Sequence, residues 1–493
     1  MARSTAEGLA RPLAELHGDG DVARRSVNLR DWFVWLIVGL TLGGAVLRFT
    51  MLGQSYWYDE AVTVDLVRSS FWSMVHKLPS SESTPPLYYG IAWVWIRIFG
   101  TTEVALRSLS AVFGIAAIPV AAAAGKELIS RPAGALAGAF VAASPLLIWY
   151  SQEARAYSLY VLLSALSLLL FARARKSPSR RRLWWWALVS ALAIWTEYFA
   201  GFLVVAEALL LASNQSSRRH LKLPLLALAG STALLLPLVH KQVHNGRNTW
   251  IAAASVQSRV EYAARWFLGL PSHWWWVLAA VALLAVAATA LADPGERRAS
   301  VVPVALAAAC VLLPFAARAA GKDYWLFRNV IDAWVPLAIA LAAVLVSQSA
   351  RPWYVRAALV ALSLTVVALL ALRATTIVTN PHKRVDWRGL AGCLGRPDAR
   401  RVFLITPAYN GDALKLYRPN IRAPRQTDSG ISEVDIIGNP GNMPVPSGWH
   451  SQGRICTSTI SVLRLRASPA VSVPKSILRG VSGASVLVDA NLE

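Results

Sequence analysis

Two acidic residues stand side by side just after the first long apolar run of this chain. Asp59 and Glu60 lie in the stretch WYDEAVTVDL, which begins at Trp57. Carboxylates placed where a helix leaves a bilayer suit two interpretations, a solvated helix cap or a base that acts on a substrate held at the membrane surface. The choice depends on which other charges the fold brings to the same place.

Further charged residues fall in connectors that we expect on the same side of the membrane as Asp59. Glu82 lies in the same connector, Glu153 and Arg155 lie in YSQEARAYSLY, and Glu197 lies in a short apolar hairpin. A carboxylate at membrane depth is costly, so Glu197 suggests function. Glu153 and Arg155 are also compatible with an ordinary charged helix end.

Basic residues also fall in these connectors, against the preference of Lys and Arg for cytoplasmic loops. The set is Lys241, Arg247, Arg259, Arg265, Arg318, Lys322 and Arg328. Because Arg presents a planar fork of donors to phosphate oxygens, an anionic ligand is one reason to keep such residues. Binding to phospholipid headgroups is the alternative for any one of them.

Carboxylates and phosphate-binding cations at a lipid boundary suit a lipid-linked sugar phosphate as substrate. The cations would hold the phosphate and stabilise it as it leaves. A carboxylate would take the proton of an acceptor hydroxyl, which attacks the anomeric carbon. This base has the role of the carboxylate that activates the nucleophile in inverting glycoside hydrolysis.

Composition places these residues in a polytopic α-helical membrane protein. Of the 493 residues, 55% are hydrophobic and 15% are charged, whereas a soluble protein has about 25% charged residues. Apolar runs of about 17 to 20 residues, the length that crosses a bilayer, recur between Trp32 and Leu372. The net charge of +22 is typical of basic cytoplasmic loops rather than of nucleic-acid binding. The first run reads as an anchor and not as a cleaved signal peptide.

Placing the strongly basic connectors in the cytoplasm predicts eleven spans. They are Trp32–Met51, Ala105–Ala124, Ala133–Trp149, Ala156–Phe171, two short helices in Leu183–Ser213 that turn near Glu197, Leu223–Val239, Trp274–Leu291, Val301–Ala317, Val330–Val346 and Val355–Leu372. The prediction is a cytoplasmic arm (1–31), a transmembrane catalytic domain (32–373) and an extracytoplasmic domain (374–493), in the cytoplasmic (inner) membrane.

The connector 52–103 is the longest before the C-terminal region, and long connectors are often functional. It contains PPLYYGIAWVWIRIFG (Pro85–Gly100), which is apolar but short. Counting this segment as a span would invert every later loop, so we predict a juxtamembrane or re-entrant helix.

The composition changes after Thr375 toward a small α/β domain of about a hundred residues. VDWRGLAGCLG and YNGDALKLYRP are typical of helices, and RRVFLIT and Ser458–Arg466 are typical of strands. Cys393 and Cys456 both fall in this region and could pair if it lies outside the cytoplasm, a question that the sequence leaves open.

Several ordered motifs resemble one family, the GT-C membrane glycosyltransferases that use dolichyl- or polyprenyl-phosphate sugars. The motifs are WYDEA, PPLYYGIAWVWIRIFGTTEVALRSLSAVFG, SPLLIWYSQEARAYSL and YWLFRNVIDAWVPLAIALA, between Trp57 and about Ala342. The branch includes protein O-mannosyltransferases and the lipid A aminoarabinose transferase.

The resemblance implies that Asp59 is the catalytic base, with Glu60 beside it. It implies donor-phosphate contacts for Arg328, and it places Glu153 and Arg155 at the cavity. The full candidate set adds Lys322 and Arg155 to the phosphate-binding residues and Glu82, Tyr88, Glu153, Glu197 and Tyr198 to the cavity and acceptor residues. No metal ligand is assigned, although a divalent cation stays open as a cofactor.

This chain departs from many relatives at two places that leave the sugar and acceptor open. Thr84 precedes the Pro-Pro pair and Glu197 precedes Tyr198, where many relatives have His. We expect an inverting transferase that moves one sugar from a polyprenyl-phosphate donor to a lipid, glycan or protein acceptor on the outer face of the membrane. The alternatives are a transporter or flippase of a lipid-linked sugar, and a non-catalytic membrane scaffold.

Overall fold

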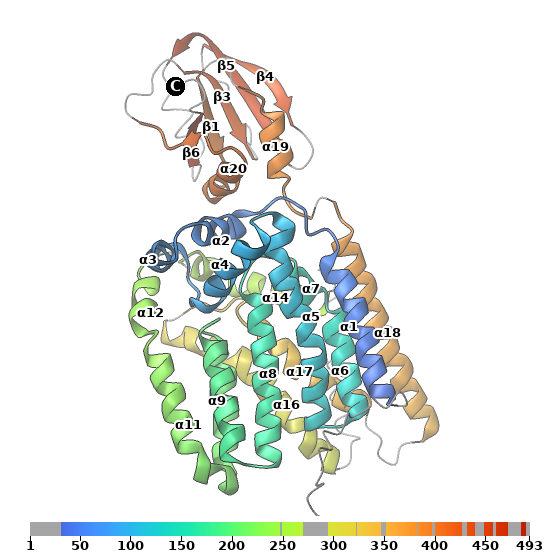
Figure 1. Cartoon of the computed structure of the whole chain (residues 1–493). Helices are drawn as coiled ribbons and strands as arrows, with labels where there is room; N and C mark the ends of the chain where they lie inside the picture. Colours follow the sequence, from blue (N-terminus) through green and yellow to red (C-terminus); the bar gives the residue numbers. More distant parts are fainter. Residues whose placement is uncertain are drawn as a thin grey trace, which may run out of the picture.

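The apolar runs form helices that pack side by side into a bundle, and a small β-sheet lies beyond one end of that bundle (Figure 1). The computed structural model describes residues 31–246, 249–269, 294–321, 323–346, 352–381, 383–396, 400–425, 431–438, 448–456, 460–471 and 485–489. The predicted span Trp274–Leu291 and the predicted arm up to residue 30 lie outside the described residues.

Helices of 5 to 26 residues make up most of the bundle. They are α1 (Trp32–Phe49), α5 (Glu103–Leu128), α6 (Arg131–Ala143), α7 (Pro145–Ser151), α8 (Tyr157–Lys176), α9 (Arg180–Ile194), α10 (Ala200–Ser213), α11 (Gln215–Ala233), α12 (Leu236–Val243), α13 (Thr249–Ala253), α14 (Val256–Leu268), α16 (Pro294–Ala317), α17 (Trp334–Leu345) and α18 (Trp353–Val378), with 3₁₀ turns η1 (Arg318–Ala320) and η2 (Ile331–Ala333).

Five helices in the described residues are long and apolar enough to cross a membrane, and the number rises to seven if each of two bent pairs forms one span. One bent pair is α6 with α7, where the chain turns by 57° at Ser144. The sequence predicts a single run there. Pro145 begins the new helix and Ser144 Oγ accepts from Leu147 N at 3.4 Å, so residues that start a helix break the run. The total of eleven spans stays a prediction.

The connector after α1 folds into three short helices, α2 (Tyr58–Arg68), α3 (Phe71–Ser81) and α4 (Leu87–Phe99). They lie across the end of the bundle nearest the sheet (Figure 1). With 13 residues, α4 is too short to span a bilayer. Its Trp95 ring donates to Ala105 O on α5 at 2.8 Å, which packs this helix against the bundle.

The C-terminal region forms a six-stranded mixed sheet with the strand order β2-β6-β1-β3-β5-β4. The strands are β1 (Arg401–Ile405), β2 (Ile421–Arg422), β3 (Ile431–Ile437), β4 (Trp449–Ile455), β5 (Val462–Val471) and β6 (Ser485–Asp489), accompanied by α19 (Trp387–Cys393), η3 (Ala408–Asn410) and α20 (Gly411–Tyr417). Strands β1 and β3 are parallel, and the other pairs are antiparallel. The two predicted helices and the strand at Arg401 are therefore found, whereas the strand predicted over Ser458–Arg466 begins at Val462, with Ser458 and Thr459 outside the described residues. Cys393 and Cys456 form a disulfide with their Cα atoms 5.8 Å apart.

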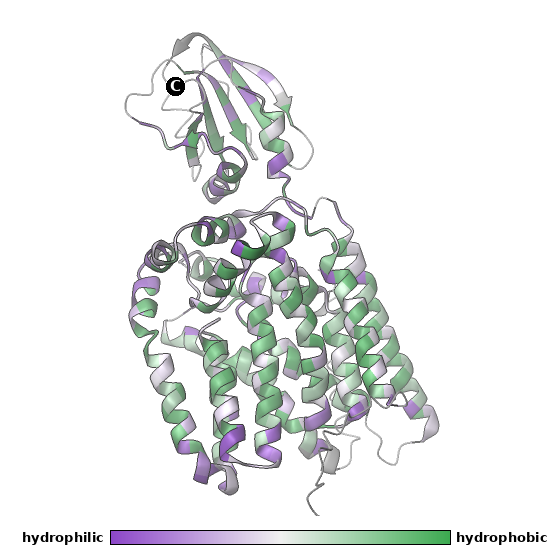
Figure 2. Ribbon diagram, in the orientation of Figure 1, coloured by the Kyte–Doolittle hydropathy of each residue, from purple (hydrophilic) through white to green (hydrophobic). Residues whose placement is uncertain are grey.

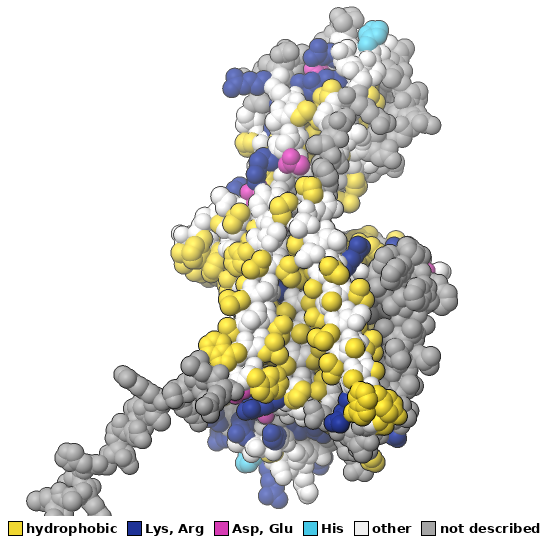
Figure 3. Space-filling view, turned by 90° about the vertical axis from the view of Figure 1, so that its right-hand side faces the viewer, with side chains coloured by type: hydrophobic (Ala, Val, Ile, Leu, Met, Phe, Trp, Pro, Cys, Tyr) yellow, Lys and Arg dark blue, Asp and Glu magenta, His cyan; other side chains and the backbone are white. Residues whose placement is uncertain are grey.

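The two ends of the bundle differ in charge. We call the end that faces the sheet the sheet end, and the opposite end, which carries the α8–α9 connector RARKSPSRRR (173–182), the basic end. Hydrophilic colour marks the helix tips at the basic end in Figure 2, and Figure 3 shows Lys and Arg side chains gathered there below a broad hydrophobic face. This distribution is typical of a membrane protein whose basic loops lie on one side of the bilayer.

Candidate active site

Asp59 and Arg328 meet at the sheet end, although 269 positions separate them in the chain. Asp59 lies in the first turn of α2, and Arg328 lies in the segment between η1 and η2. Arg328 Nη1 donates to Asp59 Oδ2 at 3.1 Å, and the two side chains stay 22% and 15% exposed. The Arg328 guanidinium also lies 5.8 Å from the centre of the Trp250 ring. A carboxylate and a guanidinium that remain open to a ligand therefore share one place.

A second ion pair fixes the segment that carries Arg328. Arg259 on α14 binds both carboxylate oxygens of Asp323 at 2.8 and 2.7 Å and also donates to Trp325 O at 2.9 Å. Arg318 contacts the same carboxylate at 3.1 Å. Two of the cations that the sequence offered for phosphate thus already have an acidic partner. Lys322 lies outside the described residues.

Glu60, the neighbour of Asp59, is fully buried. Its carboxylate accepts from Arg107 Nε at 2.8 Å, Arg107 Nη2 at 2.5 Å and the backbone N–H of Ala154 at 2.8 Å. Burial alone would raise the pKa of Glu60, but Arg107, Arg384 and these hydrogen bonds outweigh it and lower the pKa to about 2. Glu60 is therefore an ionised carboxylate whose oxygens already face donors.

Arg155 and Glu82 form another buried pair beside Asp59. Arg155 donates to the two Glu82 oxygens at 2.5 and 3.0 Å, and its Nη1 also reaches Asp59 O at 3.3 Å and Thr63 Oγ1 at 3.2 Å. The Arg155 guanidinium thus ties the connector carrying Glu82 to the start of α2. Its terminal nitrogens are engaged by protein atoms, unlike the more open Arg328.

Glu153 faces two basic residues that follow α18, Lys383 and Arg384. Its Oε1 accepts from Trp149 Nε1 at 2.8 Å and lies 3.4 Å from Arg384 Nη2. Burial raises the pKa of Glu153, while Arg384 acts in the opposite direction. Lys383 donates to Gln152 Oε1, and burial, assisted by Arg384, lowers the pKa of Lys383 to about 6. The segment between α18 and the sheet therefore places one guanidinium group and one amine with a lowered pKa beside Glu153.

The remaining predicted residues are buried around this centre. Tyr88 is fully buried and its hydroxyl lies 3.2 Å from Ser110 Oγ. Glu197 is buried in the turn between α9 and α10 and makes no ion pair within the described part of the chain. Tyr198 donates to Gln242 Oε1 at 2.7 Å, and Gln242 donates to Thr84 O at 3.0 Å. Gln242 thus connects Thr84 with Tyr198, the residue that follows Glu197.

The sheet domain holds the chain that leads into Asp59. Tyr56 N donates to the Tyr417 hydroxyl at 2.7 Å, and Ser55 Oγ donates to Asp386 Oδ1 at 2.9 Å. Ala61, two residues after Asp59, packs into the apolar cluster that includes Phe403 and Leu414 of the sheet domain. The position of the first turn of α2 therefore depends on the sheet domain as well as on the bundle.

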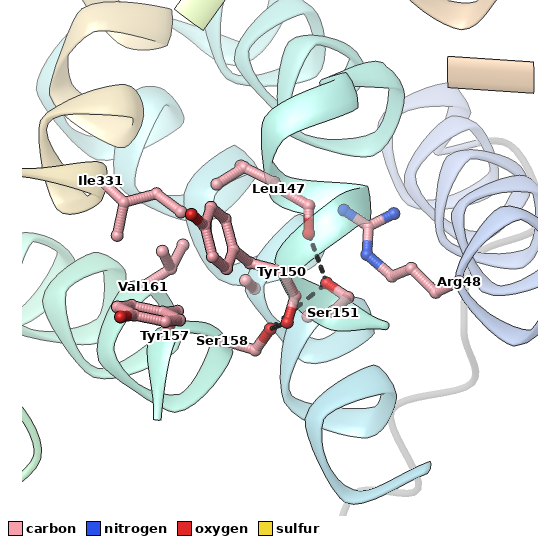
Figure 4. Close-up of a pocket in the computed structure, with 10 residues that line it drawn as sticks. Arg48, Leu147, Tyr150, Ser151, Tyr157, Ser158, Val161 and Ile331 are labelled. Carbon is pink, nitrogen blue, oxygen red and sulfur yellow. Dashed lines mark hydrogen bonds between the residues drawn. The ribbon is translucent and has the colours of Figure 1, made fainter. Parts of the chain in front are cut away.

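A buried arginine that the sequence analysis did not single out supports the bend between α6 and α7. Arg48 Nη2 donates to Val141 O at 2.9 Å, and its Nη1 donates to Ala142 O at 3.2 Å. These carbonyls end α6 and lose their helical partners at the bend. Arg48 also borders a cavity of about 10 Å³ with Tyr150 and Tyr157, both shown in Figure 4. That volume is close to the minimum for one water molecule.

Signals for these additional residues were present but weak. Arg48 and Arg107 are single basic residues near the ends of apolar runs. Lys383 and Arg384 are basic residues that follow the last predicted span, in the region that the sequence analysis predicts to lie outside the cytoplasm, where basic residues are less expected. The role of each of these basic residues becomes clear only from the carboxylate or carbonyl oxygens that it contacts in the structure.

No group of three or more His, Cys, Asp or Glu side chains within the described ranges has the geometry to hold a metal ion. The two histidines at a spacing of four, His240 and His244, contact each other, with the His244 ring nitrogen Nδ1 2.7 Å from His240 O. The candidate site is thus described by its carboxylates and guanidinium groups.

One family model matches part of the chain. Residues 83–240 match the family described as dolichyl-phosphate-mannose-protein mannosyltransferase. The matched segment contains Glu153, Arg155 and Glu197 but neither Asp59 nor Arg328. A search of curated proteins finds no match.

Solved structures match over nearly the whole chain. ArnT from Cupriavidus metallidurans in the apo state has a TM-score of 0.56 at 15% identity, covering 90% of this chain and 99% of that chain. The structure of the same protein bound to undecaprenyl phosphate has a TM-score of 0.55 at 14% identity, with the same coverage. The oligosaccharyltransferase of Archaeoglobus fulgidus gives 0.46 and 12%, covering 75% of this chain and 59% of that chain, a likeness too weak to use further.

At these identities the comparison concerns fold. The likeness to ArnT extends over 90% of this chain, and the family model independently matches the segment after Glu82. The resemblance predicted from the sequence motifs is confirmed: this chain has the fold of the GT-C membrane glycosyltransferases that use polyprenyl-phosphate-linked donors.

Proposed function

We propose that the chain is an inverting glycosyltransferase that moves one sugar from a polyprenyl-phosphate donor to a lipid, glycan or protein acceptor. The pairing of Asp59 with Arg328 carries the proposal, because it joins a base to a phosphate-binding group at the end of an apolar bundle. The similarity to ArnT, which has been solved with undecaprenyl phosphate, supports the lipid part of the donor.

In the proposed reaction, Asp59 accepts the proton of an acceptor hydroxyl as its oxygen attacks the anomeric carbon. The bond from that carbon to the phosphate oxygen breaks, and its electron pair leaves with the lipid phosphate. A single displacement inverts the anomeric configuration. Arg328 stabilises the negative charge on the leaving phosphate, since a guanidinium has five N–H donors and only one contacts Asp59.

Glu60 has a different proposed role from the one that its place in the motif implies. Because its oxygens already bind Arg107 and Ala154 N, we assign it to positioning Asp59 rather than to proton transfer. Arg155 and Glu82 act in the same way on the backbone of Asp59. Glu153, Glu197 and Tyr198 remain proposed cavity residues, and Tyr88 joins α4 to α5 through the contact of its hydroxyl with Ser110 Oγ.

We propose that the sheet end faces the outside of the cytoplasmic membrane. The Cys393–Cys456 disulfide favours this, because disulfides persist outside the reducing cytosol. The connector RARKSPSRRR at the opposite end favours it too, because basic loops stay in the cytoplasm. Membrane-impermeant labelling of a cysteine introduced at exposed Tyr409 of the sheet domain tests the orientation. Labelling only after membrane lysis would contradict it.

The test of the reaction is Asp59→Asn, assayed with polyprenyl-phosphate sugars. We expect turnover to fall by about 10²- to 10⁴-fold, the usual contribution of a general base. Asp65→Asn is the matched control, because Asp65 lies on the same helix but is exposed and pairs with Lys77 at the surface. Normal turnover by Asp59→Asn would remove the mechanism, and Arg328→Ala with unchanged donor binding would favour a scaffold.

A flippase for lipid-linked sugars is the second candidate, because buried carboxylates inside a bundle often mark transport pathways. Glu207 accepts from Ser167 Oγ at 2.6 Å and Trp186 Nε1 at 2.8 Å, and it has no ion pair among the described residues. Transport of a labelled donor across proteoliposomes that is abolished by Glu207→Gln, with transfer unaffected by Asp59→Asn, would favour the flippase.

A further inference from the structure

The hairpin of α8 and α9 lies at the basic end of the bundle, far from the candidate active site (Figure 1). Side chains of this hairpin line a groove. Its volume is about 600 Å³, and its walls are Leu170, Arg173, Ser179, Arg181, Arg182 and Trp185. The connector RARKSPSRRR, which marks the cytoplasmic side in the sequence, thus also shapes a cavity.

Polarity follows the same order on both walls of this groove. On α8, Leu170 lies three residues before Arg173, which is nearer the hairpin turn. On α9, Trp185 lies three and four residues beyond Arg182 and Arg181 and is therefore farther from the turn. At 1.5 Å per residue, the apolar side chains lie about one helical turn deeper in the bundle than the guanidinium groups. A ligand that fits both walls has an anionic head and an apolar tail.

The guanidinium groups of the groove keep donors available. Among the described residues, Arg181 makes no hydrogen bond or ion pair. Arg182 uses one nitrogen, Nη1, on Ser177 O at 2.5 Å. Arg173 lies 3.6 Å from Glu127 Oε1. One carboxylate thus faces part of a connector that carries six basic residues, so the local charge favours an anion.

We propose that this groove binds one anionic phospholipid of the adjacent leaflet. Arg181 and Arg182 hold the phosphate, and the acyl chain lies along Leu170 and Trp185. A soluble phosphate or a nucleic acid would use the guanidinium groups but leave the apolar wall exposed to water. Trp185 is 50% exposed, which suits a tryptophan at the level of lipid headgroups.

The experiment compares two double variants of the full-length protein that remove the same charge. Arg181→Gln with Arg182→Gln alters the groove, whereas Arg175→Gln with Arg180→Gln alters exposed residues of the same connector that do not line it. Bound phosphatidylglycerol and phosphatidylcholine are quantified by native mass spectrometry of the purified protein. We expect the groove variant to bind phosphatidylglycerol about tenfold more weakly, which corresponds to about 1.4 kcal/mol, because glutamine keeps part of the hydrogen bonding but not the charge. The control is expected to bind as the wild type does.

Two further arms separate a lipid site from nonspecific charge and from a soluble anion site. Trp185→Ala is expected to weaken phosphatidylglycerol binding while leaving phosphatidylcholine binding unchanged, and glycerol phosphate, the head without a tail, is expected not to compete. Equal losses in the two double variants would overturn the proposal in favour of nonspecific charge. Effective competition by glycerol phosphate would also overturn it, in favour of a soluble anion site.

Folding of the variants is checked by their melting temperatures in neutral detergent. The substituted arginines are exposed, so these temperatures are expected to match that of the wild type. The result does not depend on the proposed transferase activity, because the lipid is measured directly and the groove lies at the opposite end from Asp59.

Discussion

Asp59 and Glu60 are adjacent acidic residues on one helix, yet the fold treats them in opposite ways. Asp59 points to a partly exposed pair with Arg328, in which one donor contacts one oxygen at 3.1 Å. Glu60 points into the protein, where Arg107 and the N–H of Ala154 occupy its carboxylate. In the first turn of α2, Asp59 thus remains open to a ligand, whereas Glu60 holds the helix in position.

The difference shows why an acidic pair is useful at this place. A base must be able to exchange its partner for a proton, which a saturated and fully buried carboxylate does with difficulty. The helix that carries the base must nevertheless be held still, because small displacements reduce catalysis strongly. Side chains that point in different directions from adjacent positions meet both requirements.

The largest effect on stability is expected from Glu60→Ala. Removing one partner of a buried ion pair leaves Arg107 without a counter-ion and costs about 3 to 5 kcal/mol. Thermal unfolding of the purified protein in detergent measures this loss. The double variant Glu60→Ala with Arg107→Met is the control and should recover part of the loss, because Arg107 no longer leaves an unpaired charge. Recovery is expected to be incomplete, since Arg107 also donates to the backbone carbonyls of Leu52, Gln54 and Ser55. A single variant as stable as the wild type would show that the pair does not hold α2.

Arg328→Lys tests the more open member of the comparison. Lysine keeps the positive charge but lacks the planar set of N–H donors of arginine. It therefore cannot contact Asp59 and a phosphate together with the geometry that Arg328 allows. We expect donor-lipid affinity to fall about tenfold, which corresponds to one charge-assisted hydrogen bond, with little change in melting temperature. Isothermal titration with a polyprenyl phosphate gives the affinity. An unchanged affinity would mean that Arg328 acts as a simple point charge.

Tyr417→Phe tests whether the sheet domain helps to position Asp59, because it removes a contact between that domain and the chain leading into α2. The variant removes the hydroxyl that accepts from Tyr56 N and donates to Glu103 Oε1 at 2.5 Å. A loss of about 1 kcal/mol in the free energy of unfolding is expected, together with a severalfold lower kcat at unchanged donor affinity. If kcat stays at the wild-type value while stability falls, the sheet domain does not position Asp59.

Lys383, beside Glu153, is expected to affect how stability depends on pH. The pKa of Lys383 in the folded protein is lowered from 10.5 to about 6 by burial. Between these values the unfolded chain binds one more proton than the folded chain at this group, so its contribution makes stability rise with pH. Melting temperatures between pH 7 and pH 9 should therefore increase less in Lys383→Met than in the wild type. Parallel curves for the two proteins would contradict a buried, neutral amine.

The elements of the fold were largely predictable because each rests on a local pattern. The short hairpin that turns near Glu197, the short helix after Pro86 and the strand at Arg401 all follow from apolar run lengths and helix-breaking residues. The bend at Ser144 was missed, although Ser-Pro is a helix-start signal, because the apolar run continues through it and dominates the pattern.

The site was predictable by residue type but not by role. The sequence nominated Asp59, Arg155 and Arg328 together, and the structure brings their side chains or backbones into one neighbourhood. It could not separate the saturated Glu60 from the more open Asp59, since adjacent positions on a helix carry the same local signal. Arg107 and Arg384 were not nominated, because their meaning comes from the carboxylates that they face.

The sequence alone determined that this is a helical membrane protein with basic connectors on one side and a small mixed domain at its C-terminal end, because hydrophobicity, charge and alternation act over short stretches of chain. Only the tertiary structure decided which carboxylate is open and which is locked, and which cations already have partners. Those properties depend on burial and on distances between residues far apart in the chain, and no local pattern specifies either.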